Sequence, residues 1–121
     1  MIIISAPFGN WLHFDGCVST YGTFTLARRG GWPLRLWRAT LTLRYSRKLG
    51  GWINKMNLPN PGVAAAPQQA GGNLVSIRGF TAAEWLALVQ RLPGYNLEFN
   101  LSCPNDGHKT ALADVKLALA V

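Results

Sequence analysis

Cysteine is rare in this chain: 121 residues include two, Cys17 and Cys103. Two cysteines cannot form the disulfide framework of a small secreted domain, and the Cys and His residues show no zinc-binding spacing. The sequence therefore gives no reason to expect a bound metal. Because free thiols are typical of a reducing compartment, we expect the protein in the cytoplasm.

Long hydrophobic runs are also missing. The apolar start at residues 1–4 is soon broken by Pro7 and Gly9, so we expect neither a signal peptide nor a transmembrane segment. The composition, 49% hydrophobic and 14% charged residues, is that of a globular protein rather than a disordered one. The length suits a single domain with its own core, and we treat residues 1–121 as one domain.

Acidic residues are scarce as well, with five Asp and Glu against twelve Lys and Arg and a net charge of +7. Residues 28–55 contain no acid. Their basic residues are Arg28, Arg29, Arg35, Arg38, Arg44, Arg47, Lys48 and Lys55, and the interleaved aromatic residues are Trp32, Trp37, Tyr45 and Trp52. Such a segment attracts nucleic acid, an acidic membrane surface or phosphate groups, or it is a solvated amphipathic excursion. Since no RNA- or DNA-binding motif accompanies the charge, we expect no nucleic-acid partner.

Residues 96–105 alternate polar and apolar side chains, as a strand does. The apolar positions are Leu97, Phe99 and Leu101, and the polar positions are Asn96, Glu98, Asn100 and Ser102. Period-2 geometry gives this strand an apolar back and a polar front. In a parallel α/β barrel the back meets the outer helices, and chemistry is found where the strands end in loops. Cys103 stands at that end, before Pro104 and between the amides of Asn100 and Asn105.

A strand–helix–strand unit leads into this segment. Residues 74–78 are predicted to form a strand, and Thr81 with Glu84 makes a capping box that starts a helix over about residues 82–92. The apolar residues at helical spacing are Trp85, Leu88, Val89 and Leu92. A strand, a capped helix and a second strand form a βαβ unit, which requires parallel strands and a right-handed crossover.

The first half of the chain has weaker patterns. Residues 2–5 read as a strand and residues 11–14 as a second apolar run, which together predict an N-terminal β-hairpin. Residues 18–26 are rich in β-branched and aromatic side chains and predict another strand. Apolar residues in 34–48 show mixed helical spacing, and the segment ends at Gly50 and Gly51.

The remaining segments are loops and a final helix. Residues 54–62 combine prolines, asparagines and glycine and predict an irregular loop that must satisfy its own polar groups. Residues 63–73 are of low complexity and read as a loop or a frayed helix. Residues 109–121 have one apolar side at helical spacing and no C-cap glycine.

Three short motifs resemble the dihydroorotate dehydrogenases that use a cysteine base. Asn-Leu-Ser-Cys-Pro-Asn at residues 100–105 resembles the active-site strand and loop of that family. Gly-Thr-Phe-Thr at residues 22–25, followed by Arg28 and a Gly/Pro-rich loop, resembles the strand that lies against the flavin. Residues 54–62 resemble the Asn-x-Met-Gly-Leu-Pro-Asn-x-Gly substrate loop, with Asn57 in the glycine position. Asparagine tolerates a left-handed backbone, so the turn can be kept.

The resemblance covers most of the chain and implies an α/β fold, a cofactor and a reaction. A complete FMN-binding (β/α)8 TIM barrel takes ~250 residues, so this chain would be its N-terminal part, about half or less. The N-terminal β-hairpin and the irregular active-site loop would belong to that part. The implied reaction is the FMN-dependent oxidation of dihydroorotate to orotate in pyrimidine biosynthesis.

The family also implies roles for single residues. Cys103 would be the catalytic base that takes the proton from C5 of dihydroorotate, while the hydride from C6 passes to the flavin; a thiol with the ordinary pKa of about 8.5 is partly thiolate above neutrality. The residues implied to bind the substrate are Asn54, Met56, Asn57, Leu58, Asn100 and Asn105. The residues implied to contact FMN are Gly22, Thr23 and Asn100. A glycine lets a flat ring approach the main chain, although a strand glycine also marks bulges.

Two departures and several alternatives stay open. The lysine that the family carries near the flavin has no clear counterpart, because Tyr21 and Gly22 occupy that region. The late-strand loops that hold a cofactor phosphate in such barrels are not contained in the chain. We therefore expect the isolated chain to be inactive unless self-association or a second chain completes the barrel. The alternatives are a tRNA-dihydrouridine synthase-like flavoprotein, a noncatalytic half-barrel that self-associates, and Cys103 as a small buried hydrophobe.

Overall fold

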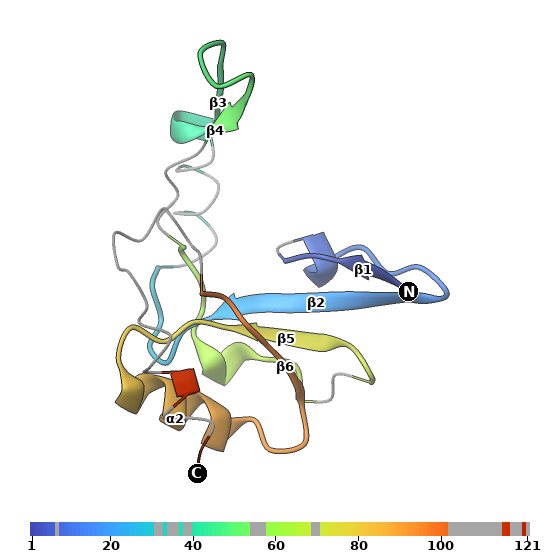
Figure 1. Ribbon diagram of the computed structural model, residues 1–121, viewed down its shortest axis with the longest axis vertical. Coiled ribbons are helices and arrows are strands. Elements are labelled where there is room, and N and C mark those ends of the chain that lie inside the picture. Colours follow the sequence, from blue (N-terminus) through green and yellow to red (C-terminus); the bar gives the residue numbers. More distant parts are fainter. Residues whose placement is uncertain are drawn as a thin grey trace.

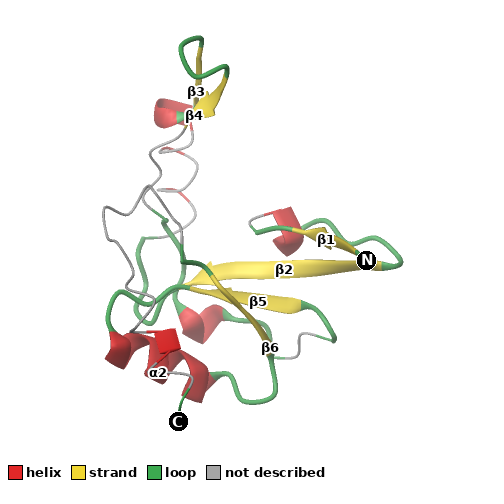
Figure 2. Ribbon diagram, in the orientation of Figure 1, coloured by secondary structure: helices red, strands yellow, loops and turns green. Residues whose placement is uncertain are grey.

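The computed structural model describes residues 1–6, 8–30, 33, 37, 40–53, 58–68, 71–101, 115–116 and 120. Their centre is a parallel sheet of four strands in the order β1-β2-β5-β6 (Figures 1 and 2). The strands are β1 (Ile2–Ile4), β2 (Cys17–Phe24), β5 (Leu74–Ile77) and β6 (Asn96–Phe99). All three pairings are parallel, which confirms the predicted mixed α/β class with a parallel sheet.

The crossover from β5 to β6 is the helix α2 (Ala82–Arg91), as the capping box predicts. The Thr81 hydroxyl oxygen accepts a hydrogen bond from the Glu84 backbone N–H at 3.2 Å. The Glu84 carboxylate reaches back and accepts one from the Phe80 N–H at 2.7 Å. The first bond satisfies a backbone N–H of the first helical turn that has no helical partner, and the second fixes the residue before the cap, so the helix begins where the sequence places it.

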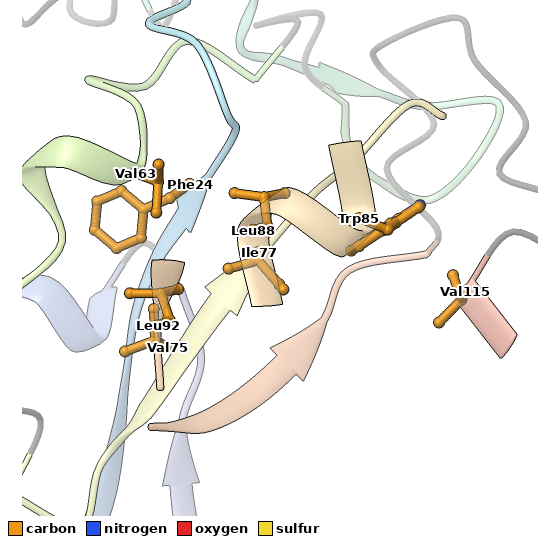
Figure 3. Packing of buried hydrophobic residues seen from close by; sticks show 8 residues of the cluster. All are labelled: Phe24, Val63, Val75, Ile77, Trp85, Leu88, Leu92 and Val115. Atoms are coloured by element: carbon orange, nitrogen blue, oxygen red, sulfur yellow. The ribbon is translucent and has the colours of Figure 1, made fainter. Parts of the chain in front are cut away.

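The hydrophobic core lies between α2 and one face of the sheet (Figure 3). Its buried members are Phe24, Val63, Val75, Ile77, Trp85, Leu88, Leu92 and Val115. Leu97 and Phe99 of β6 pack against this cluster from the same face, as the alternation of that strand predicts. Val115 lies in a segment predicted to be helical, and it and Lys116 are helical; the rest of that prediction falls outside the described residues, except Ala120.

A β-bulge in β2 changes which side chains face the polar side of the sheet. Gly22 pairs with Ser76 and Phe24 pairs with Ile77, so β2 has one extra residue between these pairs. Strict alternation would send Thr23 toward the core, and the extra residue sends Phe24 there instead. Phe24 is accordingly buried in the core, and Thr23 bonds to Ser76 across the other face.

The predicted N-terminal β-hairpin is wrong. β1 joins the main sheet parallel to β2, and residues 8–14 form no strand. A 3-10 helix, η1 (Phe8–Asn10), turns the chain back toward the sheet. Gly9 is buried there, and a side chain at this position would collide with the Thr20 backbone. A short apolar run such as residues 11–14 suggests a strand even where no neighbouring strand accepts its hydrogen bonds, which is why the prediction failed.

An antiparallel hairpin stands apart from the main sheet (Figure 1). Its strands are β3 (Arg44–Ser46) and β4 (Gly51–Ile53). The helical spacing of residues 34–48 is therefore misleading for residues 44–46, which form β3. A turn with Gly50 at φ 63° brings β4 back alongside β3. Of the other described residues in that range, 33, 37 and 40–42 are helical. The sequence of residues 63–73 predicts a loop or a frayed helix, and those of them that the structure describes are irregular apart from the short 3-10 helix η2 (Val63–Ala65). Among the described residues, the structure contains no helix of the length and apolar character needed to cross a membrane.

Candidate functional site

A row of hydrogen-bonded polar side chains crosses three neighbouring strands close to their carboxyl ends. The Thr23 and Ser76 hydroxyl groups lie 2.9 Å apart. The Ser76 hydroxyl also donates to the Glu98 carboxylate at 2.9 Å. Ser76 is fully buried and Thr23 is 7% exposed, whereas Glu98 is half-buried. The row occupies the face of the sheet opposite α2, which is where a parallel barrel places its interior.

Asn100 follows β6 and closes this polar row. Its side-chain amide donates to the Thr23 hydroxyl oxygen at 3.1 Å, and its backbone N–H donates to the Ile77 carbonyl at 3.0 Å. Its carbonyl accepts from the guanidinium of Arg78 at 2.8 Å. Side chain and main chain of Asn100 are therefore both held, which fixes the position of the chain just after β6.

Arg78 is a fully buried cation at the end of β5. Its backbone N–H donates to the Phe24 carbonyl at 2.8 Å, so β2, β5 and the residue after β6 meet around it. Its guanidinium carbon lies 5.7 Å from the centre of the Phe80 ring, and that of Arg29 lies 4.5 Å from the same centre. The buried Arg78 thus joins β2, β5 and the residue after β6 at the carboxyl ends of these strands.

The Asn10 side chain forms hydrogen bonds with both the N–H and the carbonyl group of Gly22. The Asn10 amide donates to the Gly22 carbonyl at 3.0 Å, and its oxygen accepts from the Gly22 N–H at 3.0 Å. Asn10 thus substitutes for a neighbouring strand at the bulge. A Cβ on Gly22 would lie 2.6 Å from the Ser76 carbonyl oxygen, and φ is 111°. Glycine is required here by the bulge and by close packing.

Asn60 organises the end of the irregular loop. It is 3% exposed, and its side-chain oxygen accepts from the Thr25 N–H at 3.0 Å and from the Gly62 N–H at 2.9 Å. Its side-chain N–H group donates to the Leu58 carbonyl at 3.0 Å. The backbones of Asn60 and Arg29 also exchange hydrogen bonds. In the described end of the loop, residues 58–62, the Asn60 side chain thus satisfies backbone groups of Leu58 and Gly62 and ties the loop to the segment after β2.

A small cavity of about 180 Å³ lies beside the bulge. It is lined by Asn10, Trp11, Gly22, Thr23, Phe24, Asn60, Pro61 and Ala65. A larger cavity of about 290 Å³ lies at the opposite end, next to Asn73 and Asn96, which precede or begin their strands. In parallel α/β barrels the chemistry belongs to the carboxyl ends of the strands, so the smaller cavity is the candidate site.

The predicted site residues divide into two groups. Gly22, Thr23 and Asn100 lie together at the carboxyl ends of β2 and β6, and Leu58 lies in the loop that Asn60 ties to the segment after β2. The predicted residues Asn54, Met56, Asn57, Cys103 and Asn105 lie outside the described residues.

Sequence reasoning missed several contributors to the site. Ser76 and Glu98 could have been found, because both occupy polar positions of alternating strands. Asn60 stands in the loop motif without a role assigned to it. Asn10 gave no signal, because its partner Gly22 is twelve residues away and nothing in the sequence links the two before the fold is known.

No protein-family model matches the chain, and no curated protein matches it at a significant level. The geometry of the strand ends and the three short motifs are therefore the basis for a functional assignment.

Proposed function

We propose that the chain is the N-terminal part of an FMN-dependent barrel that oxidises dihydroorotate to orotate, with Cys103 as the base. The observation that carries the proposal is the hydrogen-bonded row of Thr23, Ser76 and Glu98, closed by Asn100, at the carboxyl ends of three parallel strands. The Asn-Leu-Ser-Cys-Pro-Asn motif starts at Asn100, so it leaves the sheet at the place where barrel enzymes carry their chemistry.

The residues present fit one side of a site for a flat polar ring. Because Asn10 takes both backbone polar groups of Gly22, this glycine would offer a ring van der Waals contact rather than a hydrogen bond. The Thr23 hydroxyl and the Asn100 amide add polar groups beside it. The cavity of about 180 Å³ is smaller than the roughly 300 to 1,000 Å³ of usual ligand pockets, so other segments would have to complete the site.

The chain's own residues would bind and orient the substrate and move one proton. Bound FMN supplies the two-electron acceptor for the hydride from C6. The Cys103 thiolate takes the proton from C5, so the substrate loses one proton and one hydride and gains a C5=C6 double bond. Asn100 would direct its amide to the polar edge of the substrate, and its two main-chain hydrogen bonds hold it there.

A hybrid enzyme tests this proposal. The chain replaces the corresponding N-terminal segment of a dihydroorotate dehydrogenase that uses a cysteine base. We expect the folded hybrid to bind FMN and to oxidise dihydroorotate. Cys103→Ala should abolish turnover at neutral pH while the flavin stays bound, and Asn100→Ala should weaken orotate binding by about 1 to 3 kcal/mol.

The chain offers matched controls for both variants. Cys17→Ala changes a half-buried thiol at the amino end of β2, and Asn96→Ala an exposed amide at the amino end of β6; both should leave turnover and orotate affinity unchanged. An unchanged rate in Cys103→Ala would remove the base assignment. A hybrid with native circular dichroism that binds no FMN would contradict the family.

A self-associating half-barrel is the second candidate, and the edge strand β1 favours it. Ile2 is 66% and Ile3 46% exposed on this edge, and the segment after it exposes more large apolar side chains. An unpaired strand edge with exposed apolar residues is a template for association. In a complete barrel this edge would be paired by the last strand, so both candidates share the same surface.

Sedimentation distinguishes an open edge from a closed domain. We expect the isolated chain to sediment above the monomer mass and to show no flavin absorbance after purification with added FMN, because phosphate-binding late strands are missing. Ile2→Lys with Ile3→Lys should restore the monomer, and Leu41→Lys with Leu43→Lys in the hairpin region should not. A yellow, monodisperse monomer of the unchanged chain would refute both expectations.

A further inference from the structure

The antiparallel hairpin and the residues before it form a projecting arm, which we define as residues 40–53 and name the basic arm. Figure 1 shows β3 and β4 standing away from the parallel sheet. The two strands pair with each other, and neither joins the parallel sheet. The proposed oxidoreductase chemistry assigns no role to this arm.

The leucines of the basic arm are exposed. Leu41 is 69%, Leu43 52% and Leu49 69% exposed, and Tyr45 is 54% exposed. Soluble proteins expose single leucines often but rarely gather several on one short element. Three leucines and a tyrosine within nine positions therefore mark a surface that binds something apolar.

All charged side chains of the basic arm are positive. Arg44, Arg47 and Lys48 are all exposed. The sequence contains no acid between Asp15 and Glu84, so these cations have no acidic neighbour along a long stretch of chain. A surface that attracts them must carry negative charge.

The turn of the hairpin combines both properties. The Leu49 backbone N–H donates to the Ser46 carbonyl at 3.2 Å, and Gly50 takes a positive φ of 63°. This turn presents Leu49 at the end of the hairpin, directly after Arg47 and Lys48. Long cationic side chains keep their charge at a polar boundary while a neighbouring apolar side chain enters a less polar layer.

We infer that the basic arm is a peripheral membrane anchor, which inserts its leucines into the interface of a bilayer that contains anionic lipid. Exposed leucines interspersed with cations over residues 41–49 match the interfacial region of such a bilayer, with negative headgroups above acyl chains. A tyrosine beside them suits the headgroup level. The inference is independent of the reaction proposed for the strand ends.

Two other partners fit the basic arm less well. Single-stranded nucleic acid is bound by flat aromatic rings on which bases stack, whereas three of the four large apolar side chains described as exposed on the arm are leucines. A second copy of the chain would bring the same positive charge to the same surface, because the chain carries +7. The anionic bilayer is the partner that satisfies charge and apolar surface together.

Vesicle flotation with the whole chain tests the inference. The probes are phosphatidylcholine vesicles with and without phosphatidylglycerol, and we expect flotation only with the anionic lipid. Replacing Leu41, Leu43 and Leu49 by serine leaves the net charge unchanged and should weaken vesicle binding by at least about tenfold. Arg47→Gln with Lys48→Gln should also weaken it by at least about tenfold.

Matched variants separate the basic arm from the overall charge and the other apolar surface. Phe8, Leu12 and Phe14 replaced by serine remove three exposed apolar groups outside the arm and outside the edge strand β1. Arg91→Gln with Lys116→Gln removes the same charge from exposed helical positions. We expect both control variants to float like the unchanged chain, with circular dichroism unchanged in all four.

Three results would overturn the inference. The first is an equal loss of flotation in the arm variants and the controls. The second is flotation that survives the serine variant, since charge alone would then explain binding. The third is binding of a single-stranded RNA that the arm variants lose while vesicles fail to bind.

Discussion

Polar side chains on the polar face of the sheet are hydrogen-bonded to one another, whereas the charged side chains of the basic arm are exposed to solvent. On the sheet, Thr23, Ser76 and Glu98 satisfy one another inside the protein, and each has lost most or part of its contact with water. On the arm, Arg44 and Arg47 stay exposed beside exposed leucines. Buried polar groups are costly unless they are paired, so the first arrangement fixes geometry. Exposed charge beside apolar surface fixes no geometry and remains available to a partner.

The same contrast applies to the glycines of the two regions. Gly22 and Gly50 both have a positive φ, at 111° and 63°. Around Gly22 the space is filled by the Ser76 carbonyl and the Phe24 ring, whereas an added Cβ at Gly50 meets nothing within 4 Å. Packing around the bulge therefore leaves no room for a side chain at Gly22. At Gly50 only the backbone conformation of the turn favours glycine.

The largest expected difference is between two leucines. Leu88 of α2 is fully buried in the core, and Leu49 of the basic arm is 69% exposed. Leu88→Ala should lower the free energy of unfolding by about 2 to 5 kcal/mol because it leaves a cavity. Leu49→Ala should change it by less than about 0.5 kcal/mol. Urea unfolding followed by circular dichroism measures both, and similar losses would show that the arm packs on the core.

The two glycines give the next difference. Gly22→Ala should destabilise the fold by about 2 to 4 kcal/mol, from backbone strain and from overlap with the Ser76 carbonyl. Gly50→Ala introduces backbone strain at a positive φ but no steric overlap, so it should lower the free energy of unfolding by about 1 kcal/mol. The same urea titration checks the pair. Equal costs would mean that the sheet relaxes around the bulge and that packing does not require glycine there.

Sequence patterns predicted the elements whose partners lie close along the chain. The capping box at Thr81 and Glu84 and the alternation in residues 96–99 are local signals, and the structure confirms α2 and β6. The polar front of β6 was likewise visible in the alternation, since period 2 alone assigns Glu98 to the face opposite Leu97.

The parts that the sequence could not predict depend on distant pairings. A glycine in a strand is compatible with a bulge, but the register shift between β2 and β5 at Gly22 depends on which strand becomes the neighbour, and no local pattern encodes that. Asn10 holds the bulge from a separate segment, and its partner is known only once β1 lies beside β2. The predicted hairpin at the N-terminus is wrong for the same reason, because a short apolar run does not say which strand will be its neighbour.

The smallest expected difference concerns two threonine hydroxyls, and it tests most directly whether buried pairing separates the sheet from the arm. Thr23→Val keeps the shape but removes the oxygen that bonds to Ser76 and to the Asn100 amide, so it should cost about 1 to 2 kcal/mol. Thr40→Val removes an exposed hydroxyl that donates to the Trp37 carbonyl at 2.8 Å, and water can replace that bond, so the cost should be below about 0.5 kcal/mol. Amide hydrogen exchange gives a second measurement: the Asn100 N–H, bonded to the Ile77 carbonyl, should exchange faster in Thr23→Val and at an unchanged rate in Thr40→Val. If Thr23→Val unfolds at the same urea concentration as the unchanged chain and Asn100 keeps its protection, the polar row does not hold the strand end in place.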